Sequence, residues 1–368
     1  MTQKLVRWMV VASVAMSTGA GAAEVHINCQ NTLEDAARTN AAIAGSKAGD
    51  LIRIHGTCLV NQTIVLLGDR SYLGDSRTGT VIRQADKADL PALVASDSWN
   101  NNAPATGRPV RIAHLTLDGN RANNSGTSNL VIRSWLTVIE DVVSRNAPVD
   151  GIRLTNLAKD GKTGLTSTQV NGRISNCFID RSGANGIHVL DTGNAVTDWD
   201  LLDCWIAGSG ESAVEMNNAA GWKVQGNHVY GVQRHGIYAH RCWGTTIADN
   251  YVEDFGRAGG ENNKWYGIAC TVQGGAGSVI RDNKVFRFGA KPGPGNFVYI
   301  GVPRVNSGTG VLSVVNNVIR GAGMAGDTGI SYEVGGSAGL QVVSANNNVQ
   351  AVNQPRTVGE KVTLVNPY

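Results

Sequence analysis

The sequence predicts an all-β protein that folds as a single-domain parallel β-helix, a solenoid with a short capping helix at its N-terminal end. Two observations predict this fold class. Short apolar segments recur every 23–35 residues through the middle of the chain, and such self-similarity is typical of stacked repeats. The 368 residues also include 46 Gly and 33 Asn but are only 17% charged. Gly and Asn are poor helix formers that tolerate left-handed turns, so the composition argues against a helical bundle. Low charge and evenly spread aliphatic residues argue against disorder.

The first 48 residues are expected to lie outside the coils. Residues 1–23 have the features of a signal peptide: Lys4 and Arg7 precede a short apolar stretch that ends in small residues. Its removal would lower the formal net charge from +3 to +1, because 30 basic residues would remain against 29 acidic ones. A nearly neutral chain offers no electrostatic reason to bind nucleic acid, and no later segment is apolar enough to span a membrane. We therefore expect an exported protein, either periplasmic or secreted.

Residues 24–48 are expected to form an N-terminal cap. Leu33, Ala36, Ala37 and Ile43 have helical spacing, and Thr32 is the candidate N-cap residue. A helix over residues 32–43 would cover the open end of the first coil, which would otherwise expose its core. The coils themselves, with a C-terminal cap, are expected over residues 49–368.

The six cysteines predict disulfide chemistry rather than a metal site. Their spacing fits no CxxC zinc pattern, and export permits disulfides. Cys29 and Cys58 are expected to form a disulfide that closes the N-terminal cap. Cys177 and Cys204 are either a second pair or a stack of buried thiols.

Two patterns alternate through the coils. In the first, an apolar residue and a spacer precede a pair of Asp or Asn residues or a variant of it. In the second, a small residue precedes a short strand with alternating apolar positions. No helical pattern and no two-residue hairpin turn separates the strands, so each should pair with its equivalent one coil away. Copies of the first pattern are Ile174–Cys177, Leu202–Cys204, Ile247–Asn250, Ile280–Asn283 and Val314–Asn317. Copies of the second begin at Gly151, Gly186, Ala213, Gly236, Gly267 and Gly329.

This repeat resembles the right-handed parallel β-helix of the pectate-lyase-like superfamily, over roughly residues 49–353. The segment His114–Asn120 is similar to the Leu-Asp-Gly-Asn stretch that opens many of these helices. The resemblance implies an exported protein that acts on polysaccharides as a lyase, a glycoside hydrolase or an epimerase. The complete motif sets of polygalacturonases and the Asp-Pro-His motif of alginate epimerases are absent from the chain.

The second pattern also predicts which side chains face outward together. If the small residue is position zero, positions one and three point inward, and positions two and four point outward. Equivalent outward residues on neighbouring coils should lie about 4.7–4.9 Å apart. The outward positions carry charged and aromatic side chains, unlike the side chains on an ordinary solvated face of a sheet. The residues that we predict to be catalytic are Arg153, His188, Glu215, Tyr238 and His240.

The predicted patch contains the groups that β-elimination from a uronate sugar requires. A base must remove the proton next to the carboxylate, a cation must stabilise the charge that develops, and an acid must protonate the leaving oxygen. His188, His240 and Tyr238 are candidate bases or acids, and Arg153 or Arg241 could bind the carboxylate. The leading prediction is therefore a polysaccharide lyase that cleaves an acidic glycan in a groove on the outer face.

Two alternatives stay open. A glycoside hydrolase would use Glu215 and Asp191 as its two carboxyl groups. A non-catalytic β-helix would only bind the glycan. No cofactor is required, a bound Ca²⁺ is compatible with the prediction, and the chain could be a monomer or a trimer. The residues predicted to bind substrate are Asp191, Asn217, Arg241, Trp243, Trp265 and Tyr299.

Overall fold

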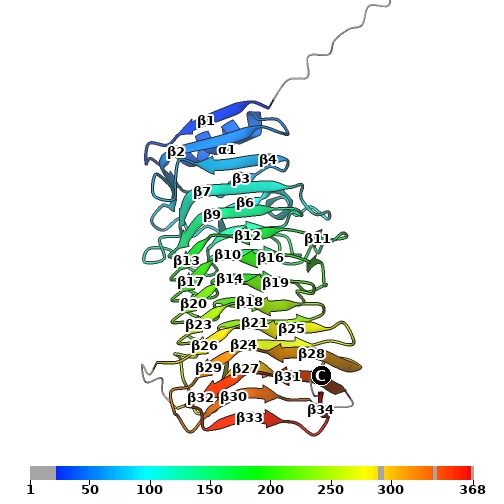
Figure 1. The fold of residues 1–368 in the computed structure, drawn as a ribbon. Helices are drawn as coiled ribbons and strands as arrows, with labels where there is room; N and C mark the ends of the chain where they lie inside the picture. Colours follow the sequence, from blue (N-terminus) through cyan, green and yellow to red (C-terminus); the bar gives the residue numbers. More distant parts are fainter. Residues whose placement is uncertain (1–21, 289–293, 335–337, 366–368) are drawn as a thin grey trace, which may run out of the picture.

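The computed structural model describes residues 22–288, 294–334 and 338–365. The predicted signal peptide therefore lies almost entirely outside the described residues and stays a prediction. Within them the chain winds into one elongated solenoid whose strands stack along a single axis (Figure 1). Strands of successive coils pair in parallel, as the repeat predicts, and the all-β fold class is confirmed.

One side of the solenoid is an eleven-stranded sheet, and it carries the strands of the second sequence pattern. Each strand pairs with its equivalent on the neighbouring coils. Its strands in order are β3 (Ile64–Leu66), β6 (Ala92–Ser96), β8 (Ser128–Ile132), β10 (Ile152–Thr155), β14 (Ile187–Leu190), β18 (Val214–Met216), β21 (Ile237–Cys242), β24 (Lys264–Val272), β27 (Asn296–Val302), β30 (Asp327–Tyr332) and β33 (Gln354–Val358).

The remaining sides are formed by one 21-stranded sheet, which bends into two ladders. The long strands β2, β7 and β9 belong to both ladders. The first ladder contains β1 (Glu24–Asn28), β2 (Leu51–Val60), β4 (Arg70–Gly74), β7 (Val110–Asp118), β9 (Val138–Arg145), β12 (Arg173–Ser175), β16 (Asp200–Leu202), β19 (Lys223–Gln225), β22 (Thr246–Ala248), β25 (Ser278–Arg281), β28 (Thr309–Val315), β31 (Gly339–Ala345) and β34 (Val362–Val365). The second ladder continues with β5 (Thr80–Gln84), β13 (Phe178–Asp180), β17 (Trp205–Ala207), β20 (His228–Tyr230), β23 (Tyr251–Glu253), β26 (Lys284–Phe286), β29 (Val318–Arg320) and β32 (Asn348–Gln350). A small separate pair is formed by β11 (Gln169–Val170) and β15 (Val196–Thr197).

Stacked asparagines hold the corner between the two ladders. The side-chain oxygen of Asn250 accepts hydrogen bonds from the backbone N–H of Asn227, at 3.0 Å, and from its side-chain amide, at 2.9 Å. The Asn250 amide in turn donates to Val224 and Asn283 at 3.0 and 2.9 Å. The same pattern continues to Asn347. The residue before each stacked asparagine has a positive φ, which Gly, Asn and Asp adopt most readily. These residues are Gly226, Asp249, Asp282, Asn316 and Asn346. The Gly and Asn surplus is thus partly explained by these corners.

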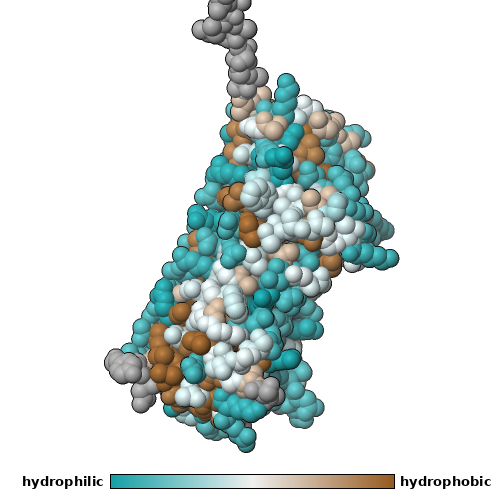
Figure 2. Space-filling model, turned by 90° about the vertical axis from the view of Figure 1, so that its right-hand side faces the viewer, coloured by the Kyte–Doolittle hydropathy of each residue, from teal (hydrophilic) through white to brown (hydrophobic). Residues whose placement is uncertain are grey.

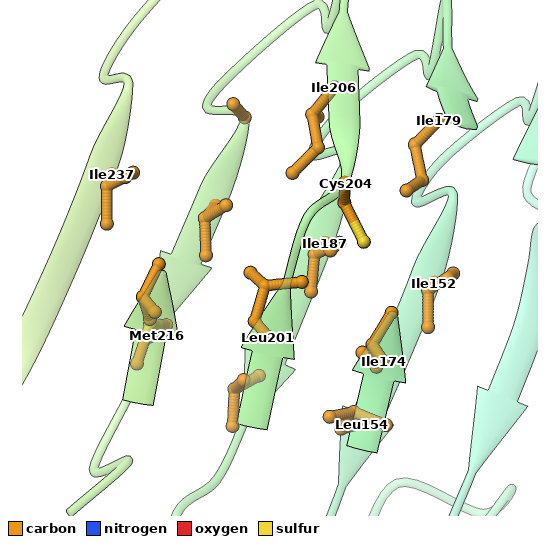
Figure 3. Packing of buried hydrophobic residues seen from close by; sticks show 14 of the residues in the cluster. Ile152, Leu154, Ile174, Ile179, Ile187, Leu201, Cys204, Ile206, Met216 and Ile237 are labelled. Atoms are coloured by element: carbon orange, nitrogen blue, oxygen red, sulfur yellow. The ribbon is translucent and has the colours of Figure 1, made fainter. Parts of the chain in front are cut away.

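The core fills the space between the eleven-stranded sheet and the two ladders. At the predicted inward positions Ile152, Leu154 and Ile187 are fully buried. Figure 3 shows these side chains packed together with Ile174 and Leu201 of the first ladder. Because each coil contributes aliphatic residues at equivalent places, the core continues along the solenoid axis.

The N-terminal helix is present but differs from the expectation. Helix α1 (Asp35–Gly45) packs against β1, β2 and β3 at the first coil. Thr32 is not its N-cap, because the helix begins three residues later, and Leu33 and Ala37 are exposed rather than buried. The buried carboxylate of Asp35 accepts hydrogen bonds from the backbone N–H groups of residues 30, 32 and 59, and these bonds fix the turn into the helix. The short helix α2 (Asp97–Asn100) follows β6.

The cysteines form two disulfides. The predicted Cys29–Cys58 bond is confirmed, and Cys242–Cys270 is a second bond that the sequence analysis missed. Cys177 and Cys204 are free and buried on neighbouring coils, which agrees with the stacked-thiol alternative.

The outer surface is mostly polar. Figure 2 shows hydrophilic and intermediate residues over most of one face, with hydrophobic residues gathered toward the C-terminal end. Within the described residues the last coil ends with β33 and β34, and the expected C-terminal cap stays a prediction. In the same part of the chain, neither helix has the length and apolar character needed to cross a membrane.

Candidate functional site

The predicted patch forms on the outer face of the eleven-stranded sheet. Arg153 pairs in register with His188, His188 with Glu215, and Glu215 with Tyr238. All four side chains are half-buried, while the residues on either side of them in each strand are buried. The alternation that was read from the sequence therefore places these four residues correctly. The column continues through Ala269, Gly301 and Ser331, which are small.

Arg153 and His188 belong to a cluster around Asp150, a residue that the sequence analysis missed. The carboxylate of Asp150 is buried and accepts hydrogen bonds from Arg153 Nε at 2.7 Å and from His188 Nδ1 at 3.0 Å. Burial alone would raise the pKa of Asp150, but the hydrogen bond from His188 and the charge of Arg153 outweigh it and hold this pKa below its usual range. Asp150 thus already balances the charge of Arg153 inside the protein. Arg153 is therefore a less favourable partner for a substrate carboxylate than an arginine without an ion pair.

The second cluster contains Glu215, Tyr238 and His240. The carboxylate of Glu215 accepts a hydrogen bond from Nε2 of His240, and the rings of Tyr238 and His240 stack with centroids 4.1 Å apart. Burial alone would raise the pKa of Glu215, but the hydrogen bond and charge of His240 outweigh it, so the pKa lies below its usual range. Burial raises the pKa of the Tyr238 phenol. The contact to Glu215 uses Nε2 of His240, whose side chain is 36% exposed.

Two further aromatic residues enclose this cluster. The ring of His235 meets that of Tyr238 edge-on at 4.6 Å, and its Nδ1 accepts a hydrogen bond from the backbone N–H of Tyr266 at 3.0 Å. Burial lowers the pKa of His235 to about 4, so the ring is neutral near pH 7. The Tyr266 ring lies 5.6 Å from Tyr238 and covers Gly301, where a Cβ atom would stand only 2.6 Å from the ring. Tyr266 is a second residue that the sequence analysis missed.

A β-bulge in β21 brings Arg241 to the same face. Ala239 pairs with Cys270 and Cys242 pairs with Val272, so His240 and Arg241 together stand opposite the single residue Thr271. Ala239 and Cys242 are fully buried, whereas His240 and Arg241 are half-buried. Bulges of this kind re-aim side chains and are frequent beside active sites. No described carboxylate forms an ion pair with Arg241, and its Nε has no hydrogen-bond partner.

The proposed carboxyl pair of a glycoside hydrolase does not form. Asp191 is 2% exposed, and its carboxylate accepts hydrogen bonds from the backbone N–H groups of Gly193, Ala195 and Val196 at 2.7–2.9 Å. Both oxygens of Asp191 are therefore used to hold the turn after β14. This structural role corrects its assignment as a substrate-binding residue and as the partner of Glu215.

Tyr299 is also wrong as a substrate-binding residue. Ile300 pairs with Ile268, so Tyr299 stands at position zero, where the other coils have a small residue. It is fully buried against the edge of Phe255, with ring centroids 5.3 Å apart, and its hydroxyl accepts a hydrogen bond from Ala322. The register was misassigned because the small residue that marks each coil is missing here.

The other predicted contacts lie around the patch. Trp265 is half-buried beside His235, and its indole N–H donates to the Gly259 carbonyl at 2.8 Å. Trp243 is 44% exposed and covers Gly274, just beyond the end of β21. Asn217 follows β18 directly and is half-buried. These three residues therefore border the patch, and their contact with a ligand stays a prediction.

The described residues do not supply a metal centre. No group of three or more His, Cys, Asp or Glu side chains among them is arranged to hold a metal ion. The chemistry that the site can perform with its own residues is proton transfer, through His240 and Tyr238, next to a guanidinium that can bind an anion.

Comparisons with known proteins agree with this fold. The family model of NosD, described as a periplasmic copper-binding protein, matches residues 155–293. Among the described residues of that segment, no three or more His, Cys, Asp or Glu side chains are grouped to hold a metal ion.

Three solved structures match most of the chain. The A-module of the Azotobacter vinelandii mannuronan C-5 epimerase AlgE4 has a TM-score of 0.58 at 16% identity, covering 91% of this chain and 97% of the other. The N-terminal fragment of bacteriophage Phi29 gene product 12 has a TM-score of 0.60 at 14% identity, covering 91% of this chain and 64% of the other. The Agl-KA catalytic domain has a TM-score of 0.57 at 13% identity, covering 97% of this chain and 70% of the other. The repeat, the observed coils and these matches together show that the chain has the fold of a parallel β-helix.

Proposed function

We propose that this protein is an exported carbohydrate-active enzyme that cleaves a uronate-containing polysaccharide by β-elimination. One observation carries the proposal: a stacked Tyr238–His240 pair, supported by Glu215, shares its face of the sheet with an Arg241 that no described carboxylate neutralises. This combination offers a base, an acid and an anion-binding group within one patch. These are the three groups that β-elimination from a uronate requires.

In the proposed reaction, His240 is the base. Because its Nε2–H donates to Glu215, the neutral ring carries its lone pair on Nδ1. Nδ1 takes the proton from C5 of the uronate, and the electrons of that C–H bond form the C4–C5 double bond. The bond from C4 to the glycosidic oxygen then breaks. The Glu215 carboxylate stabilises the imidazolium that His240 becomes, as a charge-assisted hydrogen bond does.

Tyr238 is the proposed acid. Burial raises the pKa of its phenol, so the group stays protonated at neutral pH and can donate a proton to the leaving oxygen. The phenolate then recovers its proton from solvent, and His240 releases its own. Arg241 binds the substrate carboxylate, where negative charge increases as C5 loses its proton.

The same face continues beyond the patch toward a cavity. Beyond Tyr238, the small residues Ala269, Gly301 and Ser331 occupy the next three coils, where Ala269 and Ser331 are buried and the Tyr266 ring covers Gly301. A cavity of about 430 Å³ follows, and it contains the Lys264–Glu333 ion pair, in which Lys264 Nζ lies 2.8 Å from a Glu333 oxygen. Three coils span about 14 Å at the usual strand spacing. We propose that a polymer lies along the solenoid axis, over Tyr266, and reaches this cavity.

The comparison with a mannuronan C-5 epimerase guides the choice of substrate, because that enzyme is named for mannuronan. Purified protein would be incubated with polymannuronate, polygalacturonate and a neutral glucan. Ultraviolet absorbance detects the unsaturated uronate, and a reducing-end assay detects any cleavage. We expect both signals from at least one polyuronate and neither from the neutral glucan. New reducing ends without the unsaturated product would contradict β-elimination. Retained binding without any product would favour the non-catalytic alternative.

A matched pair of variants connects the activity to the site. Tyr238→Phe removes the proposed acid and is expected to lower the rate about 10²–10⁴-fold, the usual contribution of a general acid or base. The control is Tyr251→Phe, which also removes one tyrosine hydroxyl. Tyr251 contacts a histidine too, His228, but it lies on the second ladder and outside the patch. This control should keep the wild-type rate. Equal rates for both variants would remove Tyr238 from the mechanism.

A further inference from the structure

The Cys242–Cys270 disulfide lies directly beneath the bulge that carries His240 and Arg241. Cys242 is the residue at which the bulge ends and regular pairing resumes. Its partner Cys270 belongs to the next coil and immediately precedes Thr271, the residue opposite the bulge. Both cysteines are essentially buried, at 0% and 1% exposure, so the bond is on the core side of the sheet while the bulge faces outward.

A bulge is a weak point in a ladder, because two residues oppose one and the local pairing is interrupted. Between Ala239 and Cys242 the paired register shifts, so the ladder alone does not fix His240 and Arg241. The neighbouring coils carry the same sheet without such an interruption between Glu215 and Tyr238. A covalent bond at the end of the bulge supplies the constraint that the interrupted ladder lacks.

We propose that the Cys242–Cys270 disulfide is a positioning device for the site: it holds the bulge in the shape that places His240 against Glu215 and Arg241 on the outer face. The cysteines act through the bulge and do not touch the substrate. This inference rests on the proposed function only for its activity readout. Its structural content, that the bond fixes residues 239–242, stands apart from the reaction.

The chain supplies its own control. Cys29–Cys58 closes a loop with a sequence separation of 29 residues, against 28 for Cys242–Cys270, and it lies at the N-terminal cap, far along the axis from the bulge (Figure 1). Loop-closure entropy depends on loop length, so removing either bond should affect the unfolded state almost equally. A difference in activity between the two variants then reports on position rather than on general stability.

The test compares the double variants Cys242→Ala/Cys270→Ala and Cys29→Ala/Cys58→Ala with the wild type, well below the unfolding temperature of each. We expect kcat/KM on the polyuronate to fall at least about tenfold in the first, which corresponds to about 1.4 kcal/mol of lost transition-state stabilisation. The loss should appear in both kcat and KM, because the bulge carries both the base and the carboxylate-binding arginine. The second variant should stay within about twofold of wild type. Similar kcat/KM values in the two variants would overturn the proposal.

A second measurement does not depend on activity. Backbone hydrogen exchange of the segment 237–243, followed by mass spectrometry, should become faster in the first variant and stay unchanged in the second. If the wild type shows no activity, the proposed function fails, yet this exchange comparison still decides whether the disulfide holds the bulge. Unchanged exchange in both variants would overturn the inference even for an active enzyme. If the alanine variant does not fold, Cys242→Val/Cys270→Val fills the space of the lost sulfurs and allows the same comparison.

Discussion

The hydrogen bond between Glu215 and His240 gives a graded prediction. Glu215→Gln retains a side-chain oxygen that can accept from Nε2 of His240, and it retains the volume of the side chain, but it removes the negative charge. Glu215→Ala removes the acceptor altogether. If Glu215 stabilises the imidazolium that forms as His240 takes a proton, the rate should fall in two steps, first with the charge and then with the acceptor.

The size of each step follows from the type of hydrogen bond. A hydrogen bond to a charged group contributes about 1.5–3 kcal/mol, and one between neutral groups about 0.5–1.5 kcal/mol. Replacing the first with the second costs about 1–1.5 kcal/mol, which is about five- to tenfold in rate at 1.36 kcal/mol per factor of ten. Losing the bond completely costs about 1.5–3 kcal/mol, or about 10- to 150-fold.

The assay is the initial rate of unsaturated uronate formation at saturating substrate, with circular dichroism to check that each variant is folded. We expect the order wild type, Glu215→Gln, Glu215→Ala, with the intervals given above. A Glu215→Ala variant with the wild-type rate would show that the carboxylate does not support His240. An equal and complete loss in both variants would mean that Glu215 reacts directly, because then the charge itself and not the hydrogen bond would be essential.

Three further predictions concern the substrate carboxylate, the corner and acid stability. Arg241→Gln should raise KM for polyuronates about 10- to 150-fold, because one charged hydrogen-bonded contact is lost, and binding of neutral glycans, measured by calorimetry, should not change. Asn250→Ala removes four side-chain hydrogen bonds of the corner stack. At about 1 kcal/mol for each bond, the free energy of unfolding measured in urea should fall by about 4 kcal/mol. The control Asn262→Ala, at an exposed position, should change this free energy little. The pKa of Asp150 is lowered in the folded state, so the Asp150 carboxylate contributes fully to stability above the ordinary Asp pKa of about 3.9. This contribution is lost as the pH falls below that value. The thermal unfolding temperature should therefore decrease between pH 6 and pH 3, and an unfolding temperature that does not change with pH would contradict this.

The fold could be predicted because its signals are local and repeated. The stacked asparagines and the residues of positive φ before them lie next to each other in the sequence, so the corner of each coil can be recognised from two neighbouring residues. The inward aliphatic residues after each small residue follow the period of two that a strand imposes. The same period placed Arg153, His188, Glu215 and Tyr238 in one column, and the structure has them in register.

The rest of the site depends on features without a local signal. The bulge inserts one residue into β21, and nothing in the sequence His240–Arg241 distinguishes it from regular alternation. Asp150 precedes its strand in a loop, so its place beneath Arg153 and His188 depends on how that loop folds back. Asp191 looked available because it follows an outward strand, yet three backbone N–H groups of its own turn bind it.

The proposed function requires that the patch around Tyr238 and His240 breaks a glycosidic bond by elimination and not by addition of water. The most direct measurement is mass spectrometry of the products formed in water labelled with heavy oxygen. Elimination takes no oxygen from the solvent, so the cleaved chains should carry an unsaturated uronate and no label. Their rate of formation should fall about 10²–10⁴-fold in Tyr238→Phe. Incorporation of one labelled oxygen at each cleaved bond would show hydrolysis and would contradict the account.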